Sequence, residues 1–338
     1  MLSRMRRSAP VAVLVCALMP LSLAVLSGAL TLYLIDAPLR LVWTQLGALA
    51  AGWALAMWAL FALRRGPTTV NPSMPPHPAD DPNGVSQGGP GLLQASSKRT
   101  ERGFWALVLG SVALLWAAAL LGERVEGVRR WIRLGPLLVH TAALVTPVLV
   151  CVLARWAVEG RWKCVAGVSL ASWAALLAQP DAGYGCALML AMAWSVASST
   201  QHRRWAWLPA LLALVSWWRD WPVTPVGHTE GVVGLAAQWH LGLAVWDVAA
   251  LALATGAPWT IAAWRRSPDR AVGVGSMVGP VWVVMACTAL WPLVGHWPVP
   301  WVGFGASPVL GACLGLGVLA AALSCAPQSA EPDGQAGG

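Results

Sequence analysis

Charged side chains are scarce in this chain. Asp, Glu, Lys and Arg make up only 11% of the 338 residues, whereas hydrophobic residues make up 57%. A soluble domain usually carries about 25% charged residues, so this chain lacks the polar surface that a soluble protein of its length needs. The composition therefore excludes a soluble protein and predicts an integral membrane protein.

Cysteine motifs are missing as well. None of the seven Cys residues forms a CxxC pair, and their number is odd, so neither disulfides nor a zinc site are expected. Tyr and Phe are rare, with two and three residues against 23 Trp. Many Trp residues stand near the ends of apolar segments, where indole rings favour the membrane interface.

Long apolar segments are abundant. A helical span needs about 20 apolar residues, and unpaired backbone groups are not tolerated in lipid, so helices are the expected spanning form. Seven segments meet this requirement: 10–34, 41–63, 104–122, 136–157, 231–264, 271–294 and 307–326. Three shorter candidates are 162–178, 184–200 and 205–218. The sequence thus predicts an all-α, polytopic membrane protein with about ten transmembrane helices, the first of them retained rather than cleaved.

The distribution of basic residues sets the orientation. An even number of spans places both termini on one side, and Lys and Arg favour cytoplasmic loops. With the N-terminus inside, the outer segments hold only a minority of the 22 basic residues, namely Arg40, Arg124, Arg129, Arg130, Arg133 and Arg219. We therefore predict an N-in/C-in topology. The net charge of +8 reflects this bias and gives no reason to expect a nucleic-acid partner.

Composition also divides the chain into segments. Residues 1–63 hold the first two predicted helices, and residues 64–103 are rich in Pro, Gly, Ser and Asp. Such a stretch cannot bury a core, so we expect a flexible cytoplasmic linker there. An eight-helix portion is predicted over 104–326, followed by a disordered cytoplasmic tail over 327–338.

Four polar segments fall at the outer ends of the predicted helices. They are Gly127 to Gly135 (GVRRWIRLG), Gln179 to Gly185 (QPDAGYG), Pro225 to Glu230 (PVGHTE) and Pro298 to Ser307 (PVPWVGFGAS). The first segment concentrates Arg on the side where Arg is otherwise rare, and guanidinium groups suit the capture of phosphate oxygens. Internal Arg–Glu pairs, with Trp131 as an interface anchor, would explain the same residues.

The acidic residues of the other segments have two interpretations each. Asp181 is either a helix cap or a functional carboxylate. Glu230, next to His228, can act as a general base or simply favour the positive end of a helix dipole. Ser307 would cap the last helix. Asp247 is the only carboxylate placed well inside a span, where an ionisable residue is a functional hypothesis by default; a hydrogen-bonded structural role is equally open.

The order of these segments resembles that of the FtsW/RodA/SpoVE family, the shape, elongation, division and sporulation proteins. The resemblance runs from about residue 104 to 326, and the segments that carry it are 127–135, 179–183, 225–230 and 300–307. It implies ten helices with both termini inside. It also implies a bacterial plasma membrane protein that polymerises lipid-linked peptidoglycan precursor (lipid II) on the outer face, in cell division or cell-shape control.

The resemblance further implies roles for individual residues. Glu230 would deprotonate the acceptor sugar hydroxyl, which then displaces a polyprenyl diphosphate from the donor sugar with inversion. The implied substrate-binding residues are Arg130, Trp131, Asp181, His228, Thr229 and Ser307. A divalent cation could assist, although the sequence specifies no metal site. A class B penicillin-binding protein (a transpeptidase) is the implied protein partner, beside membrane lipid.

This chain departs from the family pattern at several charged positions. The family acid is Asp where this chain has Glu230, and a charged motif of the fourth span reads His140-Thr141-Ala142-Ala143 here. Two functions therefore stay open: a divergent glycosyltransferase, or a non-catalytic relative that binds the precursor or scaffolds a cell-wall complex. A transporter would explain ten helices but not the order of the outer segments.

Overall fold

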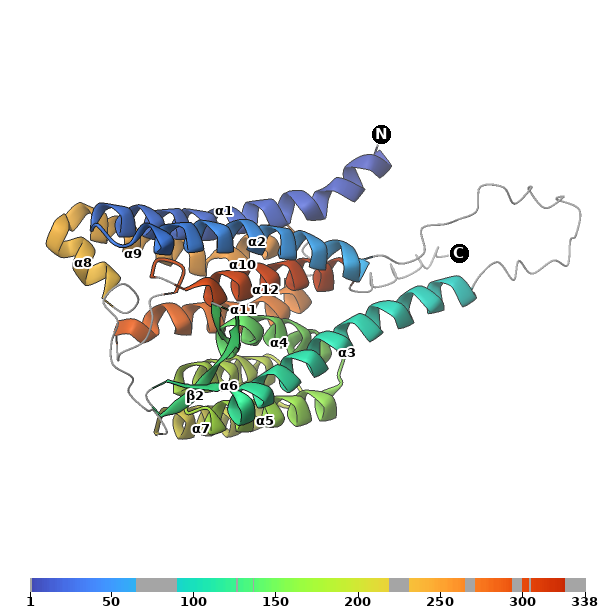
Figure 1. Ribbon diagram of the computed structural model, residues 1–338. Helices are drawn as coiled ribbons and strands as arrows, with labels where there is room; N and C mark the ends of the chain where they lie inside the picture. The colour runs from blue at the N-terminus through green and yellow to red at the C-terminus, as the bar shows by residue number, and fades with distance from the viewer. Residues whose placement is uncertain are drawn as a thin grey trace, which may run out of the picture.

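Helices make up most of the chain that the computed structural model describes, namely residues 2–64, 90–125, 127–135, 137–218, 231–264, 271–293, 300–303 and 305–325. The helices run along one common direction as a bundle (Figure 1). Their bounds in the first half are α1 Leu2–Leu34, α2 Leu39–Arg64, α3 Pro90–Leu121, α4 Thr141–Val158, α5 Trp162–Ala178 and α6 Ala182–Ala197. In the second half they are α7 Trp207–Trp218, α8 Val232–Trp239, α9 Leu241–Thr255, α10 Ala257–Trp264, α11 Ala271–Leu290 and α12 Ala306–Ser324. Two short 3-10 helices, Arg203–Trp205 and Trp291–Leu293, complete the list.

The described helices correspond in order to the ten predicted spans, which confirms the all-α membrane fold. Five are long and apolar enough to cross a membrane, and the bent pair α9–α10, with an angle of 42°, would make a sixth. Three others, in α5, α6 and α11, are apolar but shorter. The prediction of a single span over 231–264 was wrong in detail, because the chain breaks at His240, which is extended, and again at Gly256. The start of α1 and the end of α12 lie at the same end of the bundle, as N-in/C-in requires (Figure 1).

A small antiparallel sheet stands at the opposite end, where the sequence was expected to form only a loop and the start of a span. Its strands are β1 Glu123–Val125, β2 Val128–Leu134 and β3 Leu137–His140, in the order β1-β2-β3. Val, Trp and Ile in β2 favour extended backbone. Gly127 and Gly135 have φ values of +87° and +59°, which glycine adopts without strain and which allow the tight reversals between strands. The predicted span over 136–157 therefore becomes helical only at Thr141.

The predicted linker is shorter than expected at its C-terminal end. Because α3 begins at Pro90, the last part of the segment predicted as a linker is helical; residues 65–89 and the tail over 327–338 lie outside the described residues. The first two helices pack into the bundle, since α12 packs mainly against α2 and α4. Near the inner end, Cys325 Sγ lies 3.9 Å from the Leu63 carbonyl oxygen.

Close packing of α12 against α2 depends on a glycine. A Cβ atom added at Gly317 would lie 2.7 Å from Ala56 Cα. We expect Gly317→Ala to lower the free energy of unfolding by about 1–3 kcal/mol, as overpacking does. Thermal unfolding in detergent, followed by circular dichroism, measures this. Gly167→Ala in α5 is the matched control, since a Cβ there meets nothing within 4 Å; equal melting temperatures for the two variants would contradict the prediction.

Candidate functional site

Arg130 is a buried arginine that holds the turn between α5 and α6. It lies on β2 with 6% of its surface exposed. Its Nη2 donates to the carbonyl oxygen of Pro180, and its Nε donates to that of Gln179 at 3.4 Å. Gln179 is fixed in turn, because its Nε2 donates to the Leu115 carbonyl oxygen on α3 at 2.6 Å. The guanidinium group thus joins the sheet to the turn that carries Asp181.

Asp181 caps α6 and is almost fully buried. Its Oδ1 accepts from the Tyr184 backbone N–H at 3.4 Å, which makes it the N-cap residue of α6. Its Oδ2 lies 3.1 Å from His140 Nε2. Oδ2 has almost no exposed surface, and the His140 ring is the polar group that faces it. Both interpretations of Asp181 are therefore compatible: the residue caps a helix and also faces the polar centre of the site.

His140 is the residue through which the site is joined. Its Nδ1 accepts from the Ala143 backbone N–H at 3.4 Å and so caps α4. A nitrogen that accepts carries no proton, so in the neutral ring the proton sits on Nε2, facing the Asp181 carboxylate. The backbone N–H of His140 donates to Ser307 Oγ, on the first turn of α12, at 2.9 Å. One residue thus connects β3, α4, α6 and α12.

Two aromatic rings enclose His140. The Trp131 ring lies 5.7 Å from it, between centroids, and the Tyr184 ring lies 5.5 Å away on α6. Trp131 and His140 are paired residues in the register of β2 and β3, which explains why the two rings meet. The imidazole therefore has limited freedom to rotate.

The electrostatics of the site favour an ionised Asp181. Burial raises the pKa of this carboxyl, but the charge of His140 when protonated, the contact with its ring and the charge of Arg130 outweigh burial and lower the pKa below its ordinary value of 3.8. A lowered pKa means that the folded state binds the proton more weakly than the unfolded chain does. The stabilisation is therefore present above the ordinary pKa and is lost as the pH falls through the folded value.

The neighbouring arginines have local partners. Arg133 forms a bidentate pair with Glu123 across the sheet, and this contact lowers the pKa of Glu123. Arg129 Nη1 donates to the Leu120 carbonyl oxygen at 2.5 Å. The expectation of internal Arg–Glu pairs is thus confirmed for Arg133, whereas Arg130 points inward.

The segment that leads into α12 is held by the N-terminal helices. Gln45 on α2 is fully buried; its Nε2 donates to the carbonyl oxygens of Trp301 at 2.6 Å and Gly303 at 3.1 Å, and its Oε1 accepts from the Gly305 N–H at 3.4 Å. These contacts retain Trp301 at a φ of +64°, which is unusual for a residue with a side chain. The same segment delivers Ser307 to His140.

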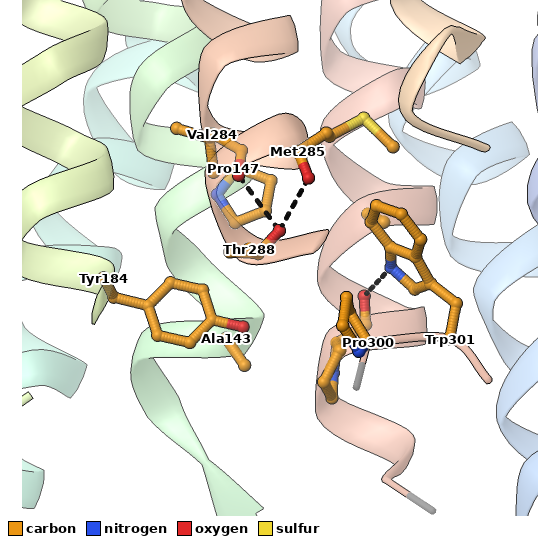
Figure 2. A pocket seen from close by; sticks show the side chains of 10 residues that line it. Ala143, Pro147, Tyr184, Val284, Met285, Thr288, Pro300 and Trp301 are labelled. Carbon is orange, nitrogen blue, oxygen red and sulfur yellow. Dashed lines mark hydrogen bonds between the residues drawn. The ribbon is translucent and has the colours of Figure 1, made fainter. Parts of the chain in front are cut away.

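A small apolar pocket, with a cavity volume of about 10 Å³, adjoins this polar cluster. Figure 2 shows Tyr184 on one side of it and Pro300 and Trp301 on the other. Thr288, in its wall, donates to the carbonyl oxygens of Val284 and Met285 on its own helix, both at 3.0 Å. Tyr184 therefore contacts the His140 ring and also borders the pocket. The pocket is lined by Ala143, Pro147, Tyr184, Val284, Met285, Thr288, Pro300, Trp301, Pro308 and Ala312.

The structure brings four of the predicted site residues together around His140: Arg130, Trp131, Asp181 and Ser307. The other three, His228, Thr229 and Glu230, lie outside the described residues. The chain resumes at Gly231, and α8 follows at the same end of the bundle as the sheet (Figure 1). Within the described ranges, no group of three or more His, Cys, Asp or Glu residues could hold a metal ion. His140 was not among the predicted site residues, because it fell inside the predicted span 136–157; its role became visible only once α4 was seen to begin at Thr141.

Comparison with known proteins identifies the fold. No protein-family model matches the sequence, and no curated protein does. The fold matches the polytopic membrane protein RodA, the rod shape determining protein of Thermus thermophilus, with a TM-score of 0.63, 18% identity and coverage of 92% of this chain and 97% of RodA. An alanine mutant of the same RodA gives a TM-score of 0.63 at 19% identity, with 92% and 98% covered. A chain from a structure on the coordination of polymerization and crosslinking by a peptidoglycan synthase complex gives 0.64 at 18% identity, with 90% and 96% covered.

The contribution of His140 to stability can be separated from simple capping. His140→Ala removes a cap, which costs about 1 kcal/mol, and leaves the buried Asp181 carboxylate without its neighbour, which costs about 1–3 kcal/mol more. His240→Ala is the matched control, because His240 is exposed and caps α9 through Gly242 at 3.1 Å but contacts no carboxylate in the described structure. Reversible unfolding in detergent should therefore show a larger loss for His140→Ala. If the two losses are equal, the His140–Asp181 contact does not stabilise the fold.

Proposed function

We propose that this chain is a divergent peptidoglycan glycosyltransferase that polymerises lipid-linked precursor at the outer face of the bacterial plasma membrane, in division or cell-shape control. The observation that carries the proposal is the buried cluster of Arg130, His140, Asp181 and Ser307 at the sheet end of a RodA fold. An enclosed polar cluster in an otherwise apolar bundle is costly to maintain, and such a cluster marks a functional site more often than a structural accident.

The proposed reaction joins a sugar hydroxyl to the anomeric carbon of a second sugar. Glu230 accepts the hydroxyl proton, the hydroxyl oxygen forms the new glycosidic bond, and the diphosphate leaves with the electron pair of the broken bond, so the configuration inverts. The carboxylate has to lie within hydrogen-bond reach of that hydroxyl. His228 and Thr229, its neighbours in the chain, are proposed to contact the same sugar.

The described residues would bind and orient the substrate rather than react. Asp181 would act by orienting His140, because its covered Oδ2 faces the imidazole Nε2 at 3.1 Å. The positive charge of Arg130 at this end offsets the negative charge of a diphosphate, while its hydrogen bonds preserve the turn that presents Asp181. Trp131 forms part of the aromatic wall. A divalent cation, where one takes part, would supply further charge neutralisation.

The apolar side chains around the pocket beside Tyr184 match the lipid part of such a substrate in polarity. Its walls come mainly from aliphatic, proline and aromatic side chains; of its two hydroxyl groups, on Tyr184 and Thr288, that of Thr288 is used within its own helix. Its cavity volume of about 10 Å³ is room for about one water molecule, so a polyprenyl segment would enter only after the walls separate. The pocket thus lies where a lipid diphosphate would pass from apolar to polar surroundings.

A non-catalytic role as a precursor-binding or scaffold subunit is the second candidate, and one observation favours it. Arg130 donates to backbone carbonyl groups, and Asp181 caps α6, so both residues already serve the fold. A class B penicillin-binding protein is the proposed partner in either case. Likeness to a chain of a peptidoglycan synthase complex supports a partner of this kind.

Polymerisation of purified lipid II by the purified protein separates the two candidates. We expect glycan chains from the wild type, in the presence of a class B penicillin-binding protein if not alone. Removing the proposed base should reduce the rate by about 10²-fold or more, so Glu230→Gln should yield almost no product. Gel electrophoresis of fluorescent lipid II measures the chain length.

The control makes the same chemical change at the other end of the bundle. Glu159→Gln alters a residue after α4 that pairs with Arg155 at 2.6 Å, and it should leave polymerisation unchanged. Product that survives Glu230→Gln would remove Glu230 from the mechanism. Lipid II that binds without being polymerised under any partner condition would favour the scaffold.

A further inference from the structure

Asp247 is a fully buried carboxylate between two apolar helices. It lies on α9 with 0% of its surface exposed. Ser27 Oγ donates to its Oδ1, and Thr31 Oγ1 donates to its Oδ2 at 2.7 Å. Both donors belong to α1. Among the ion pairs of the described residues, none involves Asp247.

The two hydroxyl donors match the two carboxylate oxygens. Ser27 and Thr31 are four residues apart, so they lie one above the other on the same face of α1. The other buried residues of α9 are small, which lets α9 approach α1 closely; they are Ala244, Ala250 and Ala254. A shift of α9 by one turn, about 5.4 Å, would leave a carboxylate oxygen without a donor in an apolar surrounding. An alanine face alone would tolerate such a shift, so Asp247 sets the register of the two helices.

The same part of α1 also receives the segment before α12. Gly28, between the two donors, faces Val302, and a Cβ atom added there would lie 2.6 Å from Val302 Cα. This segment is the one that Gln45 fixes and that leads to Ser307. The outer half of α1 therefore contacts both α9 and the segment that completes the polar cluster.

By holding α9, Asp247 also holds the short helix α8 that precedes it. The short helix α8 precedes α9, turns away from it at the extended residue His240, and packs on α9 and α1 (Figure 1). We call residues 232–255 the α8–α9 arm. The chain enters this arm directly after Glu230, so the position of the arm limits where that residue can reach.

We infer that Asp247 is a positioning residue: its contacts with Ser27 and Thr31 fix the α8–α9 arm against α1, and with it the end of the arm that follows Glu230. The catalytic part of this inference rests on the proposed function. The structural part does not, because it concerns only how α8 and α9 are held. In this place the carboxylate accepts two hydrogen bonds, and this positioning role does not require its negative charge.

Hydrogen exchange measured by mass spectrometry tests the structural part on the full-length protein in detergent or nanodiscs. Asp247→Ala removes both acceptors, and amides of peptides from α8 should then exchange about ten-fold faster or more, since local opening becomes easier. Amides of α12 should change little. Asp247→Asn keeps the shape and one carbonyl acceptor, and its amide can donate to the other hydroxyl oxygen, so its exchange should stay near that of the wild type.

Thr31→Val is the second variant if Asp247→Ala does not fold. It keeps the β-branched shape and removes one donor, so the exchange of α8 should rise by a smaller factor than in Asp247→Ala. Unchanged exchange in α8 for both Asp247→Ala and Thr31→Val would overturn the inference. Amide exchange of α8 that is as fast in Asp247→Asn as in Asp247→Ala would also overturn the inference, because the charge would then be the essential property.

Lipid II polymerisation then tests the catalytic part. Misplacing a reacting group by about 1 Å can cost about 10²-fold in rate, so kcat should fall at least ten-fold in Asp247→Ala. KM should change less than kcat, because the His140 cluster stays in place and only the contacts of His228 and Thr229 are weakened. Asp247→Asn should keep both values. A wild type without polymerase activity would refute the proposed function alone, since the exchange result stands without it.

Discussion

The buried carboxylate of Asp181 constrains the outer end of this bundle more than any other group. An ionised side chain that is removed from water needs partners with matching positions, and here they come from distant parts of the sequence. His140 lies at the end of β3 and Arg130 on β2. Because these partners are displaced together if the sheet moves, the sheet, the turn between α5 and α6 and the start of α4 behave as one structural unit.

A second constraint comes from the first two helices, which the sequence placed outside the family-like portion. Gln45 satisfies three backbone groups of the segment before α12. Gly28 on α1 permits close contact with that segment, and Gly317 on α12 permits close contact with α2. The residue that holds the Ser307 segment therefore belongs to α2, far away in the chain. The outer site is thus assembled from helices at both ends of the sequence.

The same groups serve the fold and the proposed chemistry. His140 caps α4 with one nitrogen and faces Asp181 with the other, so its ring orientation is set before any substrate arrives. Preorganisation of this kind is what electrostatic assistance requires. It also explains why a family-like pattern could persist in a scaffold protein, since the loss of these residues would weaken the fold whether or not the protein is an enzyme.

The sequence alone was sufficient for the class of fold. The bilayer acts on each apolar segment separately, so the ten helical segments could be predicted from local composition. The bias of Lys and Arg predicted that both termini lie on the same side. Arg130, Trp131, Asp181 and Ser307 were predicted from the resemblance of their segments to the family pattern, and not from composition. The strands around Arg130 and the break at His240 were missed, because short extended segments next to long apolar runs have no periodicity of their own.

Partnership between residues was decided only by the tertiary structure. Asp247 could be noticed from the sequence, but its donors Ser27 and Thr31 lie more than 200 residues away. Gln45 and His140 carry no local signal of their contacts with Gly303 or Asp181. A polar side chain in an apolar helix shows that a partner must exist, since burial without one is costly; which partner it has depends on which helices pack together, and that is a property of the assembled bundle.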